Sequence, residues 1–430
     1  MIEVFLMKEK NYFLQGIRIT NSLIDDIIFL FESRSKETYF SRVGSNIMTF
    51  KSILIFILNF VKRSLQIELD DFFANVDGTK SYVTKQAFSK ARKKIQPTAF
   101  VKMSNEIIKW FYKDTDFKHY KGYRLLSIDG SVLEINNTEK LREEFGYIEN
   151  QTIKVARARA TGLYDVENDM IITSSIDHYR TGERASAIEL INKLESLGSY
   201  NDLILFDRGY PSKDFISFIE SKNIKYLMRV CAAFLKAVVN VQDEDQIVEV
   251  KCKKEIIKIR VLKFELDSGT NEILITNIYN KTFTVNDFKK LYFRRWGIEV
   301  KYNELKSRLQ IENFSGETPI AIKQDFYATM YLSNMVSLAK KDANAIIEKS
   351  NADKDLKHEY KVNTNILIGK LKTSLVVMLL EKNHRKRCEI LNKIMEEISK
   401  NVIPIRPKRQ YARRMTVRAN KNSLNTKRSL

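Results

Sequence analysis

The sequence is poor in the residues that build disulfide frameworks, zinc fingers and membrane spans. Its 430 residues include three widely spaced cysteines and four histidines, too few and too scattered for the first two. The longest unbroken apolar runs, such as Ile53 to Leu58, are far shorter than the roughly 20 residues that a bilayer-spanning helix needs. The first residues mix acids and lysines with apolar residues and show no small-residue cleavage site, so we expect no signal peptide. We therefore expect a cytoplasmic protein.

Acidic residues are also in the minority. The chain has 73 Lys and Arg against 53 Asp and Glu, a formal net charge of +20. A positive field of this size concentrates polyanions through counterion release, so nucleic acid is the first partner to expect. A lysine excess that reflects only codon usage explains the same composition, and charge alone does not separate the two.

From Thr20 to about Tyr120 the sequence is patterned as helices. Apolar residues recur at helical spacing, and no stretch alternates with the period of a strand. Thr84 is placed to cap a basic helix in which Lys85, Arg92 and Lys93 lie mostly outside the apolar face. We expect residues 1–120 to form a helical N-terminal DNA-binding domain, with this helix in a groove of the DNA. A solvated basic face is the competing interpretation.

Beyond residue 120 the pattern changes to short strands. Three strands follow one another, and strands then alternate with helices, which is the order of a mixed sheet with helices packed on it. We therefore predict an α/β protein with an RNase H-like mixed-sheet core, a β-rich insertion and a helical C-terminal region. The tail has no acid and nine Lys and Arg, so we expect it to be disordered without DNA. The expected parts after the N-terminal domain are 121–230 (core, first part), 231–284 (β-sheet insertion), 285–318 (last core helix), 319–403 (helical C-terminal region) and 404–430 (basic tail).

Two aspartates stand at unusual places in this pattern. Asp129 lies in the middle of an apolar strand, where aspartate is rare because its side chain competes for backbone hydrogen bonds. Asp207 ends a later strand, and ligands gather at the carboxyl ends of strands in open α/β sheets. A hairpin turn at Asp129-Gly130 and a solvated strand end at Asp207 are the plain alternatives.

A long helix, predicted to begin near residue 285 and to continue through Leu309, carries a polar stripe. Tyr292, Arg295, Glu299 and Lys306 fall within roughly 60° of one face at about 100° per residue. Apolar residues flank the stripe on both sides, which would hold Glu299 rigidly. An ordinary surface ion pair between Glu299 and Arg295 is the competing interpretation.

This polar stripe resembles the signature of a known enzyme family. Its spacing is similar to the Tyr-Arg-Glu-Lys signature of the insertion-sequence transposases of the DDE superfamily, in the branch called the insertion sequence four family. The segment SIDGS around Asp129 resembles the first catalytic segment of that family, and FDRGY around Asp207 resembles the second. The resemblance covers about residues 122–316, with weaker echoes in the segment YRTGERA and in the basic tail.

The resemblance implies a function and a role for each residue. Members of this family are DNA transposases that bind the terminal inverted repeats of an insertion sequence, cleave the strands by metal-dependent hydrolysis and join the 3′ ends to target DNA. By position, Asp129, Asp207 and Glu299 are implied to be the catalytic acids that hold two Mg²⁺ ions, with Mn²⁺ as a substitute. The expected partner is double-stranded DNA, with the chain as a homodimer on it, in a bacterial, nucleoid-associated setting. Residues expected to contact DNA are Tyr292, Arg295, Lys306, Arg208, Trp296, Lys85, Arg92 and Lys93.

The C-terminal helical region offers a candidate interface for such a homodimer. Its predicted helix from residue 365 carries an apolar stripe along one face, and a helix buried within one chain shows the same pattern. The stripe consists of Leu367, Leu371, Leu375 and Met378.

One departure from the family leaves alternatives open. The branch resembling this chain uses a Trp in the β insertion to hold a flipped base, but the tryptophans here are Trp110 and Trp296. Either Phe234, Phe264 or Tyr279 takes that stacking role, or the step differs. Two other functions also remain possible: an RNase H-like nuclease that does not recognise transposon ends, and a non-catalytic DNA-binding regulator derived from a transposase.

Overall fold

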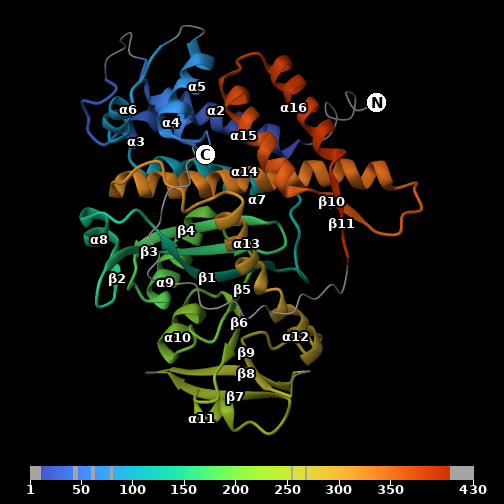
Figure 1. The fold of residues 1–430 in the computed structure, drawn as a ribbon. Coiled ribbons are helices and arrows are strands. Elements are labelled where there is room, and N and C mark those ends of the chain that lie inside the picture. Colours follow the sequence, from blue (N-terminus) through green and yellow to red (C-terminus); the bar gives the residue numbers. More distant parts are fainter. Residues whose placement is uncertain are drawn as a thin grey trace. The chain divides into compact units, whose positions relative to one another are not determined.

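The computed structural model (Figure 1) describes residues 11–41, 47–59, 63–77, 81–252, 255–266 and 269–406. The tail predicted to be disordered lies almost wholly outside them. The chain divides into two compact units. Unit 1 comprises Met1–Ile107, Leu133–Ala158 and Glu304–Leu430, and unit 2 comprises Ile108–Val132 and Arg159–Asn303. No helix in the described part of the chain is long and apolar enough to cross a membrane.

Unit 1 is built around α14 (Pro319–Asn351). Thr318 caps this helix by accepting a hydrogen bond from the amide of Ala321, and Pro319 occupies the first turn, where its missing N–H costs nothing. Helices α2, α4, α15 and α16 pack against it (Figure 1). The other elements that lie wholly or partly in this unit are α2 (Tyr12–Ile24), α3 (Ile27–Ser33), α4 (Phe50–Ile57), α5 (Leu65–Asp77), α6 (Lys85–Arg92), α7 (Thr98–Asp114), α8 (Glu139–Phe145), α15 (Thr364–Leu380), α16 (His384–Ser399), β2 (Tyr147–Glu149), β10 (Tyr360–Val362) and β11 (Val402–Pro404).

The C-terminal helix predicted as one element is two. Helix α15 ends at Leu380 and α16 begins at His384, because the side chain of Asn383 accepts hydrogen bonds from the amides of Arg385 and Lys386 and caps a new helix. The apolar stripe of α15 is buried, in a helix that contacts α2, α4, α14 and α16. The stripe is therefore part of the core of unit 1, and its assignment as a dimer interface is wrong.

A nine-stranded mixed sheet runs in the order β2-β3-β1-β5-β6-β9-β8-β7, with β4 pairing with β3. Strands β1, β5 and β6 are parallel neighbours, and β9, β8 and β7 follow in antiparallel pairs. This arrangement confirms the predicted α/β class with a mixed sheet. The strands are β1 (Arg124–Glu134), β3 (Lys154–Asp165), β4 (Met170–His178), β5 (Asp202–Phe206), β6 (Lys225–Val230), β7 (Asp245–Cys252), β8 (Glu255–Glu265) and β9 (Asn271–Thr276).

The strands predicted as an inserted sheet extend the core sheet instead. Met228 of β6 pairs with Ile275 of β9, and Val261 of β8 pairs with the same residue from the other side. The insertion is therefore continuous with the strands that carry the aspartates. The helices of unit 2 that connect or follow these strands are α9 (Glu183–Leu194), α10 (Lys213–Ser221), α11 (Lys236–Val239), α12 (Val285–Phe293) and α13 (Trp296–Ser307), of which only the last extends into unit 1.

Helix α12 is fixed at its start and along one face. Thr284 and Asp287 form a reciprocal capping box at its first turn. Phe288 and Leu291 are fully buried in one cluster with residues of the sheet such as Leu125 and Leu203. This packing fixes the end of α12, where the predicted polar stripe begins.

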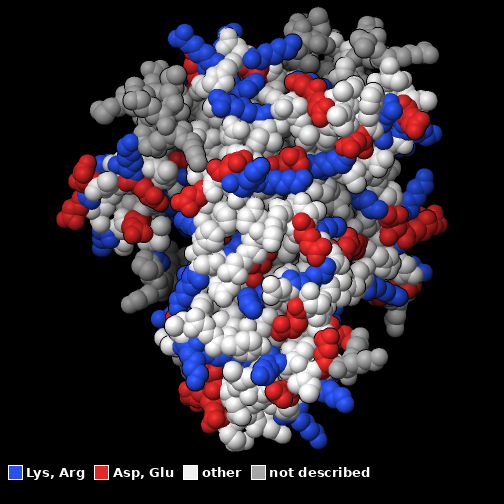
Figure 2. Space-filling model, turned by 180° about the vertical axis from the view of Figure 1, so that it is seen from behind, with Lys and Arg blue, Asp and Glu red and all other residues white. Residues whose placement is uncertain are grey.

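Basic and acidic side chains are mixed on one face of the molecule (Figure 2). On the face in Figure 2, Lys and Arg side chains are interspersed with Asp and Glu. This face shows no continuous basic area, so charge alone does not locate a DNA-binding surface on it.

Candidate active site

Asp129 lies within strand β1, which continues without a turn through Gly130 to Glu134. The hairpin alternative is therefore wrong. One carboxylate oxygen of Asp129 accepts a hydrogen bond of 2.8 Å from the amide of Gly130. Burial raises the pKa of Asp129 to about 6, with Glu299 and Glu183 adding to the rise and Arg295 opposing it.

Asp207 follows β5 directly and lies opposite Asp129. Strands β1 and β5 are parallel with Ser127 paired to Leu205, so each aspartate comes two residues beyond that pair. The Oδ1 atom of Asp207 accepts hydrogen bonds from the amide of Arg208 at 2.7 Å and from the Tyr292 hydroxyl at 3.4 Å. Two aspartates at the same level of neighbouring strands therefore face one region of unit 2.

The helix that carries the polar stripe is broken, which corrects the prediction of one long helix. Helix α12 ends at Phe293 and α13 begins at Trp296, with two turn residues between them. The amide of Arg295 donates to the carbonyl of Tyr292, three residues back, so the chain tightens at the junction. Tyr292 thus lies on α12, Arg295 in the junction and Glu299 on α13.

Arg295 is the residue that connects the three acids. It is 4% exposed, and its Nη2 donates to Glu299 Oε1 at 2.9 Å. Burial lowers the pKa of Arg295, but the charges of Tyr292, Asp207 and Glu299 outweigh it and raise the pKa overall. The same guanidinium opposes the rise in the pKa of Asp129. Its Nε is buried with no hydrogen-bond partner among the described residues.

The acids have the chemistry of a site for a hard divalent cation. All are oxygen donors, which Mg²⁺ prefers, and the carboxylate of the partly buried Asp129 accepts one hydrogen bond among the described residues, from the amide of Gly130. Among the described residues, no three Asp, Glu, His or Cys side chains are grouped closely enough to hold one ion. Glu299 is paired with Arg295 and 40% exposed. The donor set therefore fits a divalent metal in type, with Glu299 engaged by an arginine.

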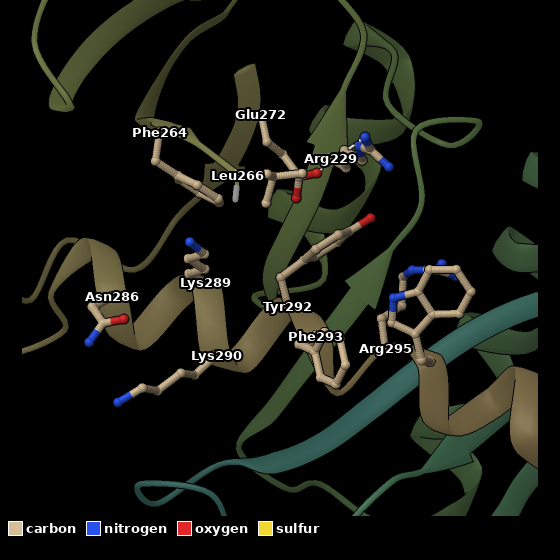
Figure 3. A pocket seen from close by; sticks show the side chains of 11 residues that line it. Arg229, Phe264, Leu266, Glu272, Asn286, Lys289, Lys290, Tyr292, Phe293 and Arg295 are labelled. Atoms are coloured by element: carbon tan, nitrogen blue, oxygen red, sulfur yellow. Dashed lines mark ion pairs between the residues drawn. The ribbon is translucent and has the colours of Figure 1, made fainter. Parts of the chain in front are cut away.

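A cavity of about 560 Å³ borders Tyr292 and Arg295 (Figure 3). Aromatic and cationic side chains share its wall, and the ammonium of Lys289 lies 5.8 Å from the centre of the Phe264 ring. Of the three residues considered for base stacking, Phe264 alone is part of this wall. The lining residues are Arg229, Phe264, Leu266, Glu272, Asn286, Lys289, Lys290, Tyr292, Phe293, Arg295 and Trp296.

The predicted DNA contacts on α6 divide into two kinds. Thr84 caps the helix as predicted, and Lys85 and Lys93 are exposed. Arg92 is 2% exposed, and its Nη2 forms an ion pair of 2.7 Å with Asp325. Its assignment as a DNA contact is therefore wrong, because the guanidinium is buried and donates to partners within unit 1.

Of the remaining predicted contacts, Tyr292 and Arg295 are buried, whereas Arg208, Trp296 and Lys306 are at least partly exposed. Arg208 is exposed after β5, and Trp296 is 38% exposed beside the cavity. Lys306 belongs to the part of α13 assigned to unit 1, where its ammonium lies 3.2 Å from Glu312. The structure therefore brings five of the predicted residues together in unit 2: Asp129, Asp207, Tyr292, Arg295 and Glu299.

Glu183, the first residue of α9, lies beside the site although the sequence argument did not select it. Its Oε1 pairs with Arg159 at 3.1 Å, and its charge raises the pKa of Asp129. A Cβ atom on Gly209 would lie 3.0 Å from its Oε2, so Glu183 also borders the loop after Asp207. The sequence signal that could have identified Glu183 was the segment YRTGERA, which contains it and weakly resembles the family.

Comparison with known proteins identifies the family. The transposase DDE domain matches residues 120–335. No curated protein matches the chain. Among solved structures, a similar chain belongs to the cryo-EM structure of a piggyBac transposase synaptic complex with hairpin DNA, at 11% identity and a TM-score of 0.47, covering 88% of this chain and 85% of that one. Because the domain match spans just over half of its residues, this protein belongs to the transposase DDE domain family.

Proposed function

We propose that this chain is the transposase of an insertion sequence, which binds terminal inverted repeats, cleaves the DNA strands by metal-dependent hydrolysis and joins the 3′ ends to target DNA. The observation that carries the proposal is the placement of Asp129 and Asp207 in register on parallel strands, with Arg295 linking them electrostatically to Glu299. The family match supports the same reaction class.

We infer further that the core is RNase H-like and that the chain belongs to the branch with the Tyr-Arg-Glu-Lys signature. The strand order β4-β3-β1-β5-β6, with β1, β5 and β6 parallel, supports the first inference. The spacing of the polar stripe supports the second.

Asp129, Asp207 and Glu299 are proposed to hold divalent metal ions, Mg²⁺ in the first place. When bound, two such ions stabilise the attacking and leaving oxygens of a phosphodiester. Glu299 accepts from Arg295 through Oε1, so its other carboxylate oxygen, Oε2, would serve as the metal ligand. The desolvated charge of Asp129 would then have a cation to balance it.

The basic residues around these acids are proposed to hold phosphates. Arg295 has donors for an anion besides the Nη2 that bonds to Glu299, including the Nε that has no partner among the described residues. Tyr292 holds Asp207 through its hydroxyl. Arg208 is exposed next to Asp207, and Lys306 is on the same helix as Glu299. These contacts position DNA without reading its sequence.

Other parts of the chain are proposed to contribute to DNA binding and assembly. Lys85 and Lys93 provide phosphate contacts from α6, and Phe264 or Trp296 offers a surface for stacking a base in the cavity. Two copies of the chain would pair when each binds one end of the element. Light scattering of the protein with and without a terminal-repeat duplex tests this by the mass of the complex. A complex of a single subunit with a single duplex that is still active in strand transfer would contradict pairing.

A plasmid that carries the gene with its flanking sequences is the substrate that tests the proposal. We expect wild-type protein with Mg²⁺ to cut it at the ends of the element. Asp129→Asn, Asp207→Asn or Glu299→Gln should each lower cleavage at least roughly 10³-fold and leave DNA binding within a few-fold. Asp243→Asn, at an exposed loop position, is the control for the same chemical change.

The products separate transposase from nuclease. Joining of the cut 3′ ends to a second plasmid supports transposition, whereas cutting at unrelated sites without joining supports a nuclease. Full cleavage by any one of the three acid variants removes that residue from the catalytic set. Specific end binding with no cleavage by the wild type, in either Mg²⁺ or Mn²⁺, supports a regulator.

A further inference from the structure

The turn between β3 and β4, residues 166–169, contacts the segment that carries Glu299. Arg294, in the junction before α13, forms an ion pair with Glu167. The Nζ of Lys301, on α13, lies 2.9 Å from Asp169 Oδ1. Two ion pairs thus connect this turn to both sides of the first turn of the helix.

Between these ion pairs the helix and the turn touch directly. A Cβ atom added to Gly297 would lie 3.0 Å from Val166 Cγ1, closer than ordinary packing allows. A side chain at position 297 would therefore require Val166 to move by a few tenths of an ångström, so glycine allows the close approach of helix and turn. Gly297 precedes Glu299 by two residues, so the contact lies in the same turn of the helix as this carboxylate.

The turn is itself firmly held. Asp165 Oδ1 accepts hydrogen bonds from the amides of Glu167 and Asn168 at 2.9 and 3.0 Å, and its Oδ2 accepts one from the Tyr112 hydroxyl at 2.7 Å. Asn168 exchanges hydrogen bonds of 2.8 and 2.9 Å with the backbone of Lys118. A turn anchored at both ends is a rigid support rather than a mobile loop.

The ion pair between Lys301 and Asp169 fixes the direction of the contact as well as its distance. Its side chain is 3% exposed, and Asp169 also accepts a hydrogen bond of 2.8 Å from Tyr164. A buried ion pair gives little net stability compared with apolar residues of the same size, but its direction selects one arrangement of the two elements. Asp169 meets this requirement with a φ of 58°, a conformation rare for residues other than glycine.

We propose that the β3–β4 turn is a positioning element that fixes the height of α13 on the sheet and, through it, the carboxylate of Glu299 relative to Asp129 and Asp207. This inference rests on the proposed role of Glu299 as a metal ligand. Neither Val166, Gly297 nor Lys301 touches the reacting atoms in this scheme.

The test introduces a small displacement and then relieves it. Gly297→Ala should push α13 from the turn, and Val166→Ala in the same chain should make room for the new methyl group. Gly369→Ala on α15 is the matched control, since a Cβ there meets nothing within 4 Å. The full-length variants are compared in plasmid cleavage with Mg²⁺, Mn²⁺ binding without DNA by paramagnetic resonance, DNA affinity and thermal midpoint.

We expect Gly297→Ala to lower cleavage about tenfold or more and to weaken Mn²⁺ binding several-fold, with DNA affinity within about twofold. The double variant should return both quantities to within about threefold of Val166→Ala alone. Lys301→Met, which keeps the length of the side chain and removes the ion pair, should move both in the same direction as Gly297→Ala.

Some results would overturn the proposal. Cleavage and Mn²⁺ binding of Gly297→Ala equal to those of Gly369→Ala would show that the contact does not matter. A loss of cleavage in Gly297→Ala that the added Val166→Ala change does not restore would also count against it. So would a thermal midpoint lowered equally in Gly297→Ala and Gly369→Ala, because the loss of cleavage would then reflect general destabilisation. Failure of the proposed function looks different, because the wild type itself would then not cut the plasmid.

Discussion

Two buried arginines, one in each unit, differ in how completely they are satisfied. Arg92 donates to Gln324 and Ser315, each at 2.8 Å, and to Asp325 at 2.7 Å. Arg295 has an equally buried guanidinium, but it donates to Glu299 and leaves its Nε without a partner among the described residues.

The difference indicates what each arginine is for. A buried donor without a partner costs free energy, so folding alone favours the complete set of partners around Arg92. The incomplete set around Arg295 lies next to Asp129 within β1, Asp207 after β5 and a cavity with aromatic side chains in its wall. Stability explains the first arginine, and binding of an anion explains the second.

The largest expected effect is on stability. Arg92→Met should lower the free energy of unfolding by about 3–5 kcal/mol, because Asp325 loses its buried cationic partner. Urea unfolding measures the change. Lys93→Met, on the same helix and exposed, should stay within about 0.5 kcal/mol of wild type. Equal stability of the two variants would break the comparison.

The reverse pattern is expected at the second arginine. Arg295→Met should lower cleavage about 10²-fold, equivalent to about 2.7 kcal/mol, and change the free energy of unfolding by no more than about 1 kcal/mol. Plasmid cleavage and urea unfolding give the two numbers. Lys193→Met, on the exposed face of α9, is the control. A loss of stability as large as that of Arg92→Met would make Arg295 a structural residue too.

Buried acids extend the comparison to pH. Asp342 accepts hydrogen bonds from the amides of Tyr12 and Phe13, and burial nevertheless raises its pKa to about 7. An acid whose pKa is raised on folding binds its proton more tightly in the folded state. The contribution of Asp342 to the free energy of unfolding is therefore most favourable below about pH 4 and is lost as the pH rises to about 7.

We expect this group to lower the free energy of unfolding by about 1–3 kcal/mol between pH 4 and pH 7. Asp342→Asn should remove that part of the slope, which urea unfolding at several pH values would detect. Lys341 is the charged neighbour that opposes the shift. An unchanged slope in the variant would assign the pH dependence to other groups.

The smallest effect concerns salt. Lys306→Ala should weaken binding to a terminal-repeat duplex a few-fold and lower the slope of log K against log salt by about one. Arg295→Ala should do the same, whereas Arg92→Met should not change the slope because Arg92 faces no DNA. Fluorescence anisotropy across a salt series sharpens the comparison, and equal slopes for all three variants would remove Lys306 and Arg295 from the interface.

Local signals predicted most of the secondary structure. The apolar pattern around Ile128 and Leu205 gave the two strands that carry the aspartates, and Thr84 marked the start of α6. These features depend on neighbours in the sequence. Strand β7 lies in the segment 231–284 that was predicted to be β-rich, but its charged residues leave its bounds unmarked in the sequence, and pairing with β8 defines them.

Distant contacts account for the errors. The basic pattern of α6 places Arg92 in solvent, but its partner Asp325 is more than two hundred residues away in the sequence. The break before α13 accompanies the contact between Gly297 and Val166, which no helix pattern reveals. Asp129 and Asp207 were singled out by their places in and after apolar strands, and the resemblance implied their grouping with Glu299.

The strand order of the sheet determines when the core can fold during synthesis on the ribosome. Strand β9 occupies the place next to β6, so residues up to Thr276 must be made and paired before the core sheet is complete. Glu299 follows only after that. A truncated or half-synthesised chain therefore contains Asp129 and Asp207 without Glu299. The third acid is added only after all strands of the sheet have been synthesised.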